Sequence, residues 1–216
     1  MNFFRLYDFG KCMKKGPYNE TGRKTKYKNN WMRIQEASVV RPDGRRGKFG
    51  LVYMGEGATV LALDRALNVL LVKEYKYALE RETIELVSGG ICPGENVEEA
   101  GIRELLEETG YRARSVTRLG TVDPFSTVIS CRNHILLAQD LIYDPLAAPP
   151  EDHLESFSVP FEAALQMVQR GEITHASSCV GLLLADKLFR GSQYNANGGL
   201  GWDGQRTSNL GYTPRQ

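Results

Sequence analysis

The sequence predicts one α/β or α+β domain whose mixed β-sheet carries helices on its faces. Three observations support this fold class. The chain has 216 residues, 42% of them hydrophobic and 25% charged, which suits a single globular domain. β-rich segments dominate its first half, and amphipathic helical patterns follow. A β-rich region, one helix, further strands and two more helices make the order of a mixed-sheet domain.

Strands are predicted where alternating or continuous apolar residues lie between turn formers. Pro42-Asp43-Gly44 predicts a turn, so residues 33–54 should form a hairpin. Residues 64–68 predict the next turn. The predicted strands are residues 33–41, 49–54, 58–63, 69–77, 84–87, 116–122 and 134–141.

Three segments carry helical patterns. Residues 96–109 should form a helix with Gly110 at its C-cap position. Residues 161–170 and 177–189 have the apolar spacing of amphipathic helices.

The two ends of the chain differ from its middle. Residues 1–30 contain eight Lys/Arg and two Asp/Glu, although the net charge of the whole chain is +1. We interpret them as a basic, solvated leader, with ordered structure starting near Trp31. A nucleic-acid partner is the alternative, which the lack of an RNA-binding aromatic motif disfavours. Residues 191–216 are Gly-rich and predict a tail, so the domain should span residues 31–190.

The cysteines and the hydropathy pattern indicate the compartment. Four widely spaced cysteines follow no zinc-binding pattern and predict reduced thiols in a cytoplasmic protein: Cys12, Cys92, Cys131 and Cys179. No apolar run approaches the ~18 residues of a membrane-spanning helix. The N-terminus lacks an apolar block of signal-peptide length, so neither a membrane partner nor secretion is expected.

The predicted helix at residues 96–109 is unusually acidic, because residues 95–108 hold six Glu and one Arg. Three of these acids share one face: Glu104, Glu107 and Glu108. Three aliphatic residues should face the core on the opposite side: Ile102, Leu105 and Leu106. Like charges at this spacing destabilise a helix by a few tenths of a kcal/mol per pair, roughly. The cluster is either a solvated acidic face or a site for a hard cation such as Mg²⁺ or Mn²⁺.

The spacing around this helix resembles the complete Nudix box, which decides between these interpretations. Gly89 is followed after five residues by Glu95 and after seven more by the segment Arg103-Glu104-Leu105-Leu106-Glu107-Glu108-Thr109-Gly110-Tyr111. Every fixed position of the box matches, and Tyr111 fills its final hydrophobic position. The resemblance implies an α/β/α sandwich with a mixed sheet and an N-terminal β-hairpin arm. It also implies an enzyme that hydrolyses pyrophosphate bonds with Mg²⁺ or Mn²⁺.

The resemblance assigns roles to residues of the box at positions 89–111. Glu104 and Glu108 are the principal metal ligands, and Glu107 joins this catalytic cluster. The carbonyl of Ser88 matches a position that gives the metal an oxygen. Three residues are structural, with Gly89 allowing close backbone approach and the other two holding the loop against the helix: Gly89, Glu95 and Arg103.

Beyond the box, residues 31–190 resemble the branch of ADP-ribose and nucleoside-diphosphate-sugar pyrophosphatases. Residues 72–77 resemble a strand that faces the substrate, and residues 85–89 resemble the approach to the box. The implied substrate-binding residues are Tyr75 or Tyr77, Lys76, Glu85 and Arg132. The acidic stretch 150–159 resembles the segment that carries the catalytic base. Glu155 matches best, with Glu151 and Asp152 as alternatives.

The resemblance implies hydrolysis of ADP-ribose to AMP and ribose 5-phosphate by a homodimer whose residues 33–54 help to build the pocket. One departure leaves GDP-mannose or another nucleoside-diphosphate sugar open. A Pro-Gly segment is expected about fifteen residues after the box, whereas here Pro124 comes sooner and Phe125-Ser126-Thr127 follows it. A non-catalytic nucleotide sensor is a remote alternative, because such domains lose box carboxylates and this chain has kept them.

Overall fold

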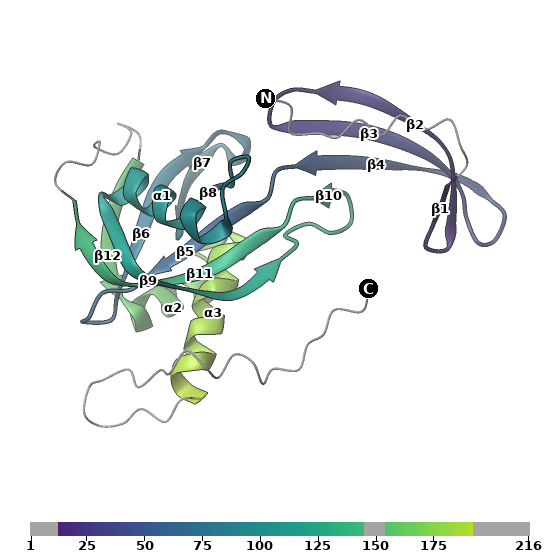
Figure 1. The fold of residues 1–216 in the computed structure, drawn as a ribbon. Coiled ribbons are helices and arrows are strands. Elements are labelled where there is room, and N and C mark those ends of the chain that lie inside the picture. The colour runs from purple at the N-terminus through teal and green to yellow at the C-terminus, as the bar shows by residue number, and fades with distance from the viewer. Residues whose placement is uncertain (1–12, 145–153, 192–216) are drawn as a thin grey trace.

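A long β-sheet arm projects from the body of the molecule (Figure 1). The computed structural model describes residues 13–144 and 154–191. The arm strands pair antiparallel in chain order, and β10 adds parallel to β4. They are β1 (Met13–Lys15), β2 (Tyr18–Lys28), β3 (Met32–Val40), β4 (Arg46–Met54) and β10 (Ile129–Ser130). The pairing of β3 with β4 confirms the predicted hairpin.

The prediction that ordered structure starts near Trp31 is wrong. β2 pairs with β3 along most of its length, from Asn19 opposite Val40 to Lys28 opposite Arg33. The polar composition misled the prediction, because a β-ladder forms between backbone groups and tolerates solvated side chains. The rest of the predicted leader, residues 1–12, and the predicted tail from residue 192 onward lie outside the described residues.

The basic residues of this segment have acidic neighbours. Lys15 and Arg23 both pair with Glu20, at 3.2 and 2.6 Å, and Lys26 lies 3.5 Å from Glu36. The positive charge of residues 13–28 is therefore partly neutralised within the arm.

The body contains two further sheets of mixed topology. One has the order β8–β5–β11–β9, in which β5 and β11 are parallel and the other pairs antiparallel. The other is the antiparallel sheet β12–β6–β7. The strands are β5 (Gly57–Ala62), β6 (Asn68–Lys76), β7 (Arg81–Glu85), β8 (Val87–Gly90), β9 (Tyr111–Val122), β11 (Asn133–Tyr143) and β12 (Leu154–Pro160). A 3₁₀ turn, Tyr77–Leu79, joins β6 to β7.

The single strand predicted at residues 84–87 is in fact the junction of two strands. Glu85 ends β7 in one sheet, and Val87 begins β8 in the other. Leu86 lies between them and is fully buried. Local β propensity does not reveal which sheet a strand joins, so the sequence pattern merged the two.

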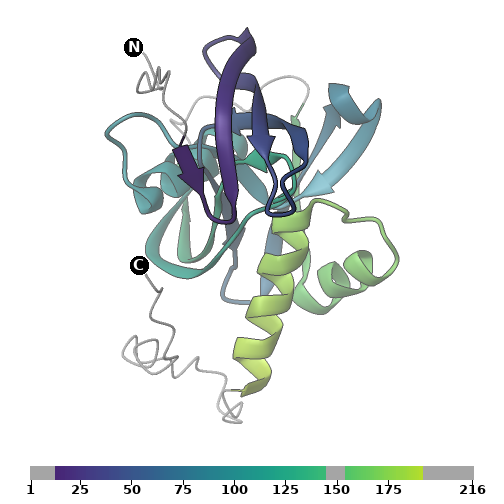
Figure 2. The same cartoon turned by 90° about the vertical axis from the view of Figure 1, so that its right-hand side faces the viewer.

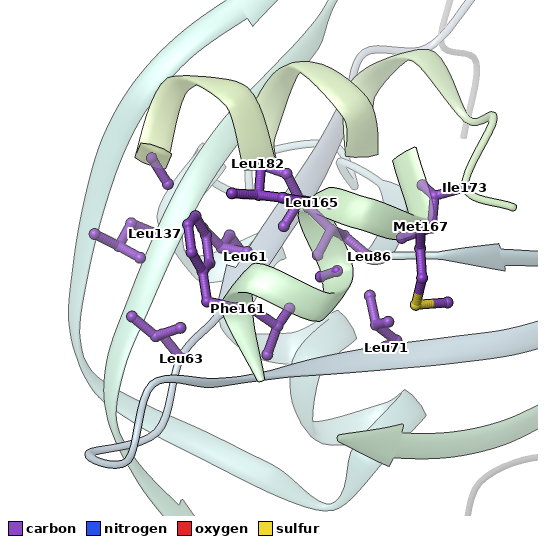
Figure 3. Close-up of a cluster of buried hydrophobic side chains, with 13 residues drawn as sticks. Leu61, Leu63, Leu71, Leu86, Leu137, Phe161, Leu165, Met167, Ile173 and Leu182 are labelled. Carbon is purple, nitrogen blue, oxygen red and sulfur yellow. The ribbon is translucent and has the colours of Figure 1, made fainter. Parts of the chain in front are cut away.

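Helices cover both faces of the body, as Figure 2 shows for α2 (Phe161–Gln169) and α3 (Ala176–Gly191) on one side. Leu165 and Leu182 of these helices pack with Leu61 and Leu71 of the sheets (Figure 3). On the other face, α1 (Val97–Thr109) packs against the second cluster of buried residues. This confirms the predicted α/β/α sandwich.

The two clusters show which face of the sheets each strand residue occupies. In β6, Leu70 and Val72 belong to the cluster on the face covered by α1. Val69 and Leu71 belong to the cluster on the opposite face, between the sheet and helices α2 and α3. Side chains alternate along a strand, so the even-numbered residues of β6 face α1. This alternation places the predicted site residues of β6 and its neighbours.

Candidate active site

The box helix α1 has well-defined ends. The Asn96 side chain accepts a hydrogen bond from the Glu99 amide at 2.8 Å, and the Glu99 carboxylate accepts one from the Asn96 amide at 3.1 Å. This capping box satisfies two amides that the first turn leaves without helical partners. Gly110 closes the helix with φ 74°, as predicted. The two caps fix where each glutamate of the helix projects.

The core-facing side of α1 differs partly from the prediction. Leu105 is fully buried as expected, but Ile102 and Leu106 are only partly buried. Ala100 and Gly101 are buried in their place. These small residues let the helix lie close to the sheet, because a Cβ at residue 101 would stand 2.4 Å from the Leu136 side chain.

Gly89 lies directly beneath the carboxylate of Glu104. A Cβ built at residue 89 would stand 2.0–2.3 Å from the carboxyl atoms of Glu104. No side chain fits in that space, so glycine is required for this close approach of strand and helix. Glu104 is thereby held against the backbone of β8, next to Ser88.

Arg103 connects the loop before α1 to the acidic face of the helix. Its guanidinium donates to Glu95 at 2.8 and 3.1 Å, to Glu104 at 2.7 Å and to Glu107 at 3.0 Å. It also donates to the Gly90 carbonyl at 2.8 Å. Glu95 in turn accepts from the Cys92 amide at 2.9 Å. The predicted Glu95–Arg103 pair is therefore present, and Arg103 also neutralises part of the acidic cluster.

Glu108 is the least satisfied carboxylate of this cluster. Its Oε2 is buried and has no hydrogen-bond partner among the described residues. Burial, followed by the charge of Glu104, raises the pKa of Glu108 to about 8, although Lys76 and a backbone hydrogen bond from Ser88 oppose the shift. Burial also raises the pKa of Glu104, despite its hydrogen bond to Arg103. These two partly buried acids therefore have too little positive charge around them to offset the cost of burial.

These donors suit a hard divalent cation. Hard cations prefer carboxylate and carbonyl oxygens, and Glu108 offers a buried oxygen that protein donors leave unused. The protein alone does not complete such a site, since no group of three His, Cys, Asp or Glu within residues 13–144 and 154–191 is arranged to hold a metal. Arg103 holds both Glu104 and Glu107 in this arrangement. An ion here would need additional oxygens, such as water or substrate phosphate.

Lys76 lies on the same face of the sheet and supplies positive charge next to the box. It is ion-paired with Glu74, and its Nζ lies 4.0 Å from Glu85 Oε2. Burial opposes its charge, but Glu74 and then Glu85 outweigh burial, so the pKa of Lys76 is raised. Glu108 adds to this effect. The structure thus brings Lys76, Glu85 and Glu108 together. That Lys76 and Glu85 bind the substrate stays a prediction.

Sequence reasoning missed a histidine beside Glu85. The buried Glu85 accepts from the Thr83 hydroxyl at 2.8 Å, and His175 Nδ1 lies 3.4 Å from its other oxygen. His175 Nδ1 also lies 2.9 Å from Ser178 Oγ. Burial lowers the pKa of His175, against the opposing charge of Glu85. No local pattern signals this contact, because His175 is ninety residues away from Glu85 in the chain.

Other predicted substrate contacts lie apart from this group. Tyr75 is half exposed and, as an odd-numbered residue of β6, faces away from α1. Tyr77 is 90% exposed in the turn after β6. Arg132 is exposed and lies 3.9 Å from Asp123 near the start of β11. Within residues 13–144 and 154–191, no hydrogen bond or ion pair joins any of these three residues to Glu104 or Glu108.

Glu155 also lies on the other face of the sheet. It stands opposite Lys73, while Phe157 stands opposite Leu71 in the same register. Phe157 and Leu71 both pack in the cluster below α2 and α3. The α1-facing neighbour of Glu155 is Leu154. The structure therefore separates Glu155 from Glu108, and the alternatives Glu151 and Asp152 lie outside the described residues.

A family model described as the NUDIX domain matches residues 54–177. The chain belongs to the Nudix family. A second model, the nucleoside diphosphate sugar hydrolase N-terminal domain, matches residues 21–52 of this Nudix hydrolase. That match covers most of β2 and all of β3, so the arm begins before the predicted boundary at residue 31.

Characterised relatives of this Nudix hydrolase act on several nucleotide compounds. This chain is 30% identical over 145 residues to the ADP-ribose pyrophosphatase of Bacillus subtilis (strain 168). The match covers 65% of this chain and 77% of the relative. The chain is 27% identical over 124 residues to the ADP compounds hydrolase NudE of Escherichia coli (strain K12), covering 57% and 67%. A crystal structure of an ADP compounds hydrolase matches with a TM-score of 0.73 at 21% identity, over 84% of this chain and 98% of the other. That likeness supports the fold.

Proposed function

We propose that this Nudix hydrolase adds water across the pyrophosphate bond of a nucleoside-diphosphate-linked sugar, with ADP-ribose giving AMP and ribose 5-phosphate as the leading case. The observation that carries the proposal is the arrangement at the box. A buried, unpartnered Glu108 oxygen and a Glu104 carboxylate held over Gly89 lie beside Lys76. The names of the relatives in Bacillus subtilis and Escherichia coli support ADP-linked substrates.

Glu104, Glu108 and Glu107, with the Ser88 carbonyl, would hold Mg²⁺ or Mn²⁺. When bound, such an ion neutralises diphosphate charge and makes a water molecule more acidic. Arg103 has two tasks. It restrains the loop through Glu95, and it keeps Glu104 and Glu107 from repelling each other.

The chain's own residues would bind and orient the diphosphate. Lys76 is the cation next to the box and would contact the substrate phosphates. Glu85 is fixed by Thr83 and would limit how far Lys76 moves. The proton of the attacking water needs a carboxylate acceptor. We assign this to the acidic segment at residues 151–155 and favour Glu151 or Asp152, because Glu155 faces the opposite side of the sheet.

Two alternatives remain distinguishable by assay. GDP-mannose or another nucleoside-diphosphate sugar would use the same diphosphate contacts and differ only in base and sugar recognition. A non-catalytic sensor would bind nucleotide without turnover. The intact Glu104, Glu107 and Glu108 favour an enzyme over a sensor.

We further propose a homodimer in which the arm contributes to the pocket of the second subunit. The arm projects from the body. It carries exposed apolar side chains, such as Trp31 in the turn between β2 and β3 and Met54 at the end of β4. Sedimentation that shows a monomer at micromolar concentration would contradict this. The partly neutralised arm gives a nucleic-acid role little support, and we propose none.

A cytoplasmic location, predicted from the cysteines, stays a proposal. Cys92, Cys131 and Cys179 are free thiols. Within the described part of the chain, no helix has both the length and the apolar character needed to cross a membrane.

A substrate panel tests the proposal. Purified protein is incubated with ADP-ribose, GDP-mannose, UDP-glucose, NADH and diadenosine polyphosphates, with Mg²⁺ or with a chelator, and the products are identified. We expect turnover of ADP-ribose to AMP and ribose 5-phosphate that the chelator abolishes. Preference for another nucleoside-diphosphate sugar would move the assignment to that substrate. Nucleotide binding without product would support the sensor.

A further inference from the structure

The segment that leads into α3 and the first turn of this helix contact β7 and the residue after it at three points. Arg81 donates to Thr174 Oγ1 at 2.9 Å, His175 lies 3.4 Å from Glu85, and the Leu86 amide donates to Ser178 Oγ at 2.9 Å. His175 is therefore held beside the strand that leads into the box. Its carbonyl accepts from the Cys179 amide at 3.0 Å, which fixes its backbone at the beginning of the helix.

Glu85 Oε2 lies near two nitrogen atoms, one of His175 and one of Lys76. Thr83 donates to Oε1, while Oε2 lies 3.4 Å from His175 Nδ1 and 4.0 Å from Lys76 Nζ. The Glu85 side chain is only 9% exposed, so water cannot easily replace either partner. His175 Nδ1 also lies 2.9 Å from Ser178 Oγ, so a proton on Nδ1 is shared between the Ser178 hydroxyl and the Glu85 carboxylate. The carboxylate favours the tautomer with that proton, because it would repel a lone pair on Nδ1.

Lys76 has more acidic neighbours than its single charge can neutralise. Glu74, Glu85 and Glu108 all act on it. An anionic substrate must compete with these carboxylates for the ammonium group. Each hydrogen bond that another group gives to Glu85 weakens the pull of Glu85 on Lys76.

We propose that His175 is a positioning residue that occupies Glu85 Oε2 and thereby keeps Lys76 available to the diphosphate of the substrate. This inference rests on the proposed function. It assigns no chemical step to His175, which acts only through Glu85 and Lys76. When the His175 imidazole is removed, Glu85 turns toward Lys76 and draws the ammonium group away from the substrate.

Kinetics on ADP-ribose with Mg²⁺ test this coupling. We expect His175→Ala to raise KM about fivefold to tenfold, the range of an ordinary polar contact, because the 3.4 Å separation from Glu85 is long, with kcat changed less than about threefold. His175→Gln retains an N–H donor and should return KM to within about twofold of wild type. In a Lys76→Met background, His175→Ala should change KM by less than about twofold, because the group through which it acts is gone. An undiminished effect in that background would overturn the proposal.

Crystal structures of the wild type and the His175 variants give a readout that needs no turnover. Lys76 Nζ should move from 4.0 Å to hydrogen-bond distance of Glu85 Oε2 when the imidazole is removed. An unchanged separation would overturn the proposal even if the substrate differs from ADP-ribose. Should His175→Ala not fold, His175→Asn keeps a polar group at the start of α3 and serves for both measurements. Absence of wild-type turnover on the whole substrate panel would instead reject the proposed function.

Discussion

The carboxylate of Glu104 occupies the space directly over the α-carbon of Gly89, where a Cβ would come within 2.0 Å of its carboxyl carbon. Gly89, the first position of the box, thus contacts Glu104, one of its central acidic residues. The contact joins a strand to the helix that follows it. Glu104 cannot keep this position above any other residue. The glycine of the motif therefore has a steric reason.

Gly89→Ala should lower activity at least about tenfold while the protein stays folded, because the flexible Glu104 side chain can swing aside but then leaves its place. Steady-state rates and thermal unfolding of the variant measure the two effects. Gly90→Ala is the matched control, since a Cβ there would meet nothing within 4 Å and should change the rate less than about twofold. Equal losses of activity in both variants would show that any added side chain on β8 lowers activity, and that the position of Glu104 is not the cause.

Glu108→Gln should lower kcat by about 10³-fold, the usual loss when a group that stabilises transition-state charge is removed. The same change should make the metal-free protein more stable at neutral pH, because it removes a carboxylate whose buried Oε2 has no hydrogen-bond partner among the described residues. Kinetics and urea unfolding of the chelator-treated protein measure both effects. Near-normal turnover would exclude Glu108 from the metal site.

The pH dependence of stability should reveal the same carboxylate. In the folded, metal-free protein the pKa of Glu108 is raised to about 8 from the ordinary 4.5. The folded state then holds a proton that the unfolded state has lost, so the contribution of Glu108 to the free energy of unfolding falls as pH rises between these values. The difference between wild type and Glu108→Gln, followed by urea unfolding over this range, isolates the effect. A difference that is independent of pH would contradict it.

Arg103→Gln should cost both stability and activity, since Glu95, Glu104 and Glu107 would lose their shared donor. We expect a loss of about 2–3 kcal/mol in unfolding free energy, as for a partly buried charged network. Arg118→Gln removes an exposed pair with Glu98 and should cost less than about 1 kcal/mol. Similar losses of unfolding free energy in the two variants would show that Arg103 stabilises the protein no more than an exposed surface residue does.

The catalytic base can be located by comparing three substitutions. Glu151→Gln or Asp152→Asn should lower kcat by about 10²-fold or more with metal affinity retained, the range for general-base catalysis. Glu155→Gln should change kcat less than about threefold, because Glu155 pairs with Lys73 on the face away from α1. A large effect confined to Glu155 would restore the assignment that the sequence alone favoured.

The local parts of this site could be predicted from the sequence. The pattern of residues 96–109 predicted the helix and its C-cap at Gly110. The resemblance to the Nudix box implied that Glu95 and Arg103 hold the loop against the helix, and the structure pairs them. These features depend on helical periodicity and on contacts between residues close in the chain. A mixed sheet with helices on its faces followed from the order of strand and helix patterns. The α/β/α sandwich was implied by the resemblance to the Nudix box.

The structural features that the sequence did not predict share one cause. The polar composition of residues 13–28 concealed a strand that is stabilised by pairing with β3. The junction at Leu86 and the outward face of Glu155 depend on which sheet each strand joins and in which register. A shift of one residue moves a side chain to the opposite face, and nothing within a short segment fixes that choice.

By itself the sequence determined an acidic helix, the glycine beneath it and the kind of chemistry that such a helix performs, because these follow from residue types at fixed short spacing. Only the tertiary structure decided that Lys76, Glu85 and His175 meet beside that helix while Glu155 turns away. The physical reason is that contacts between distant segments depend on strand register and sheet order, which are chosen by the packing of the whole core.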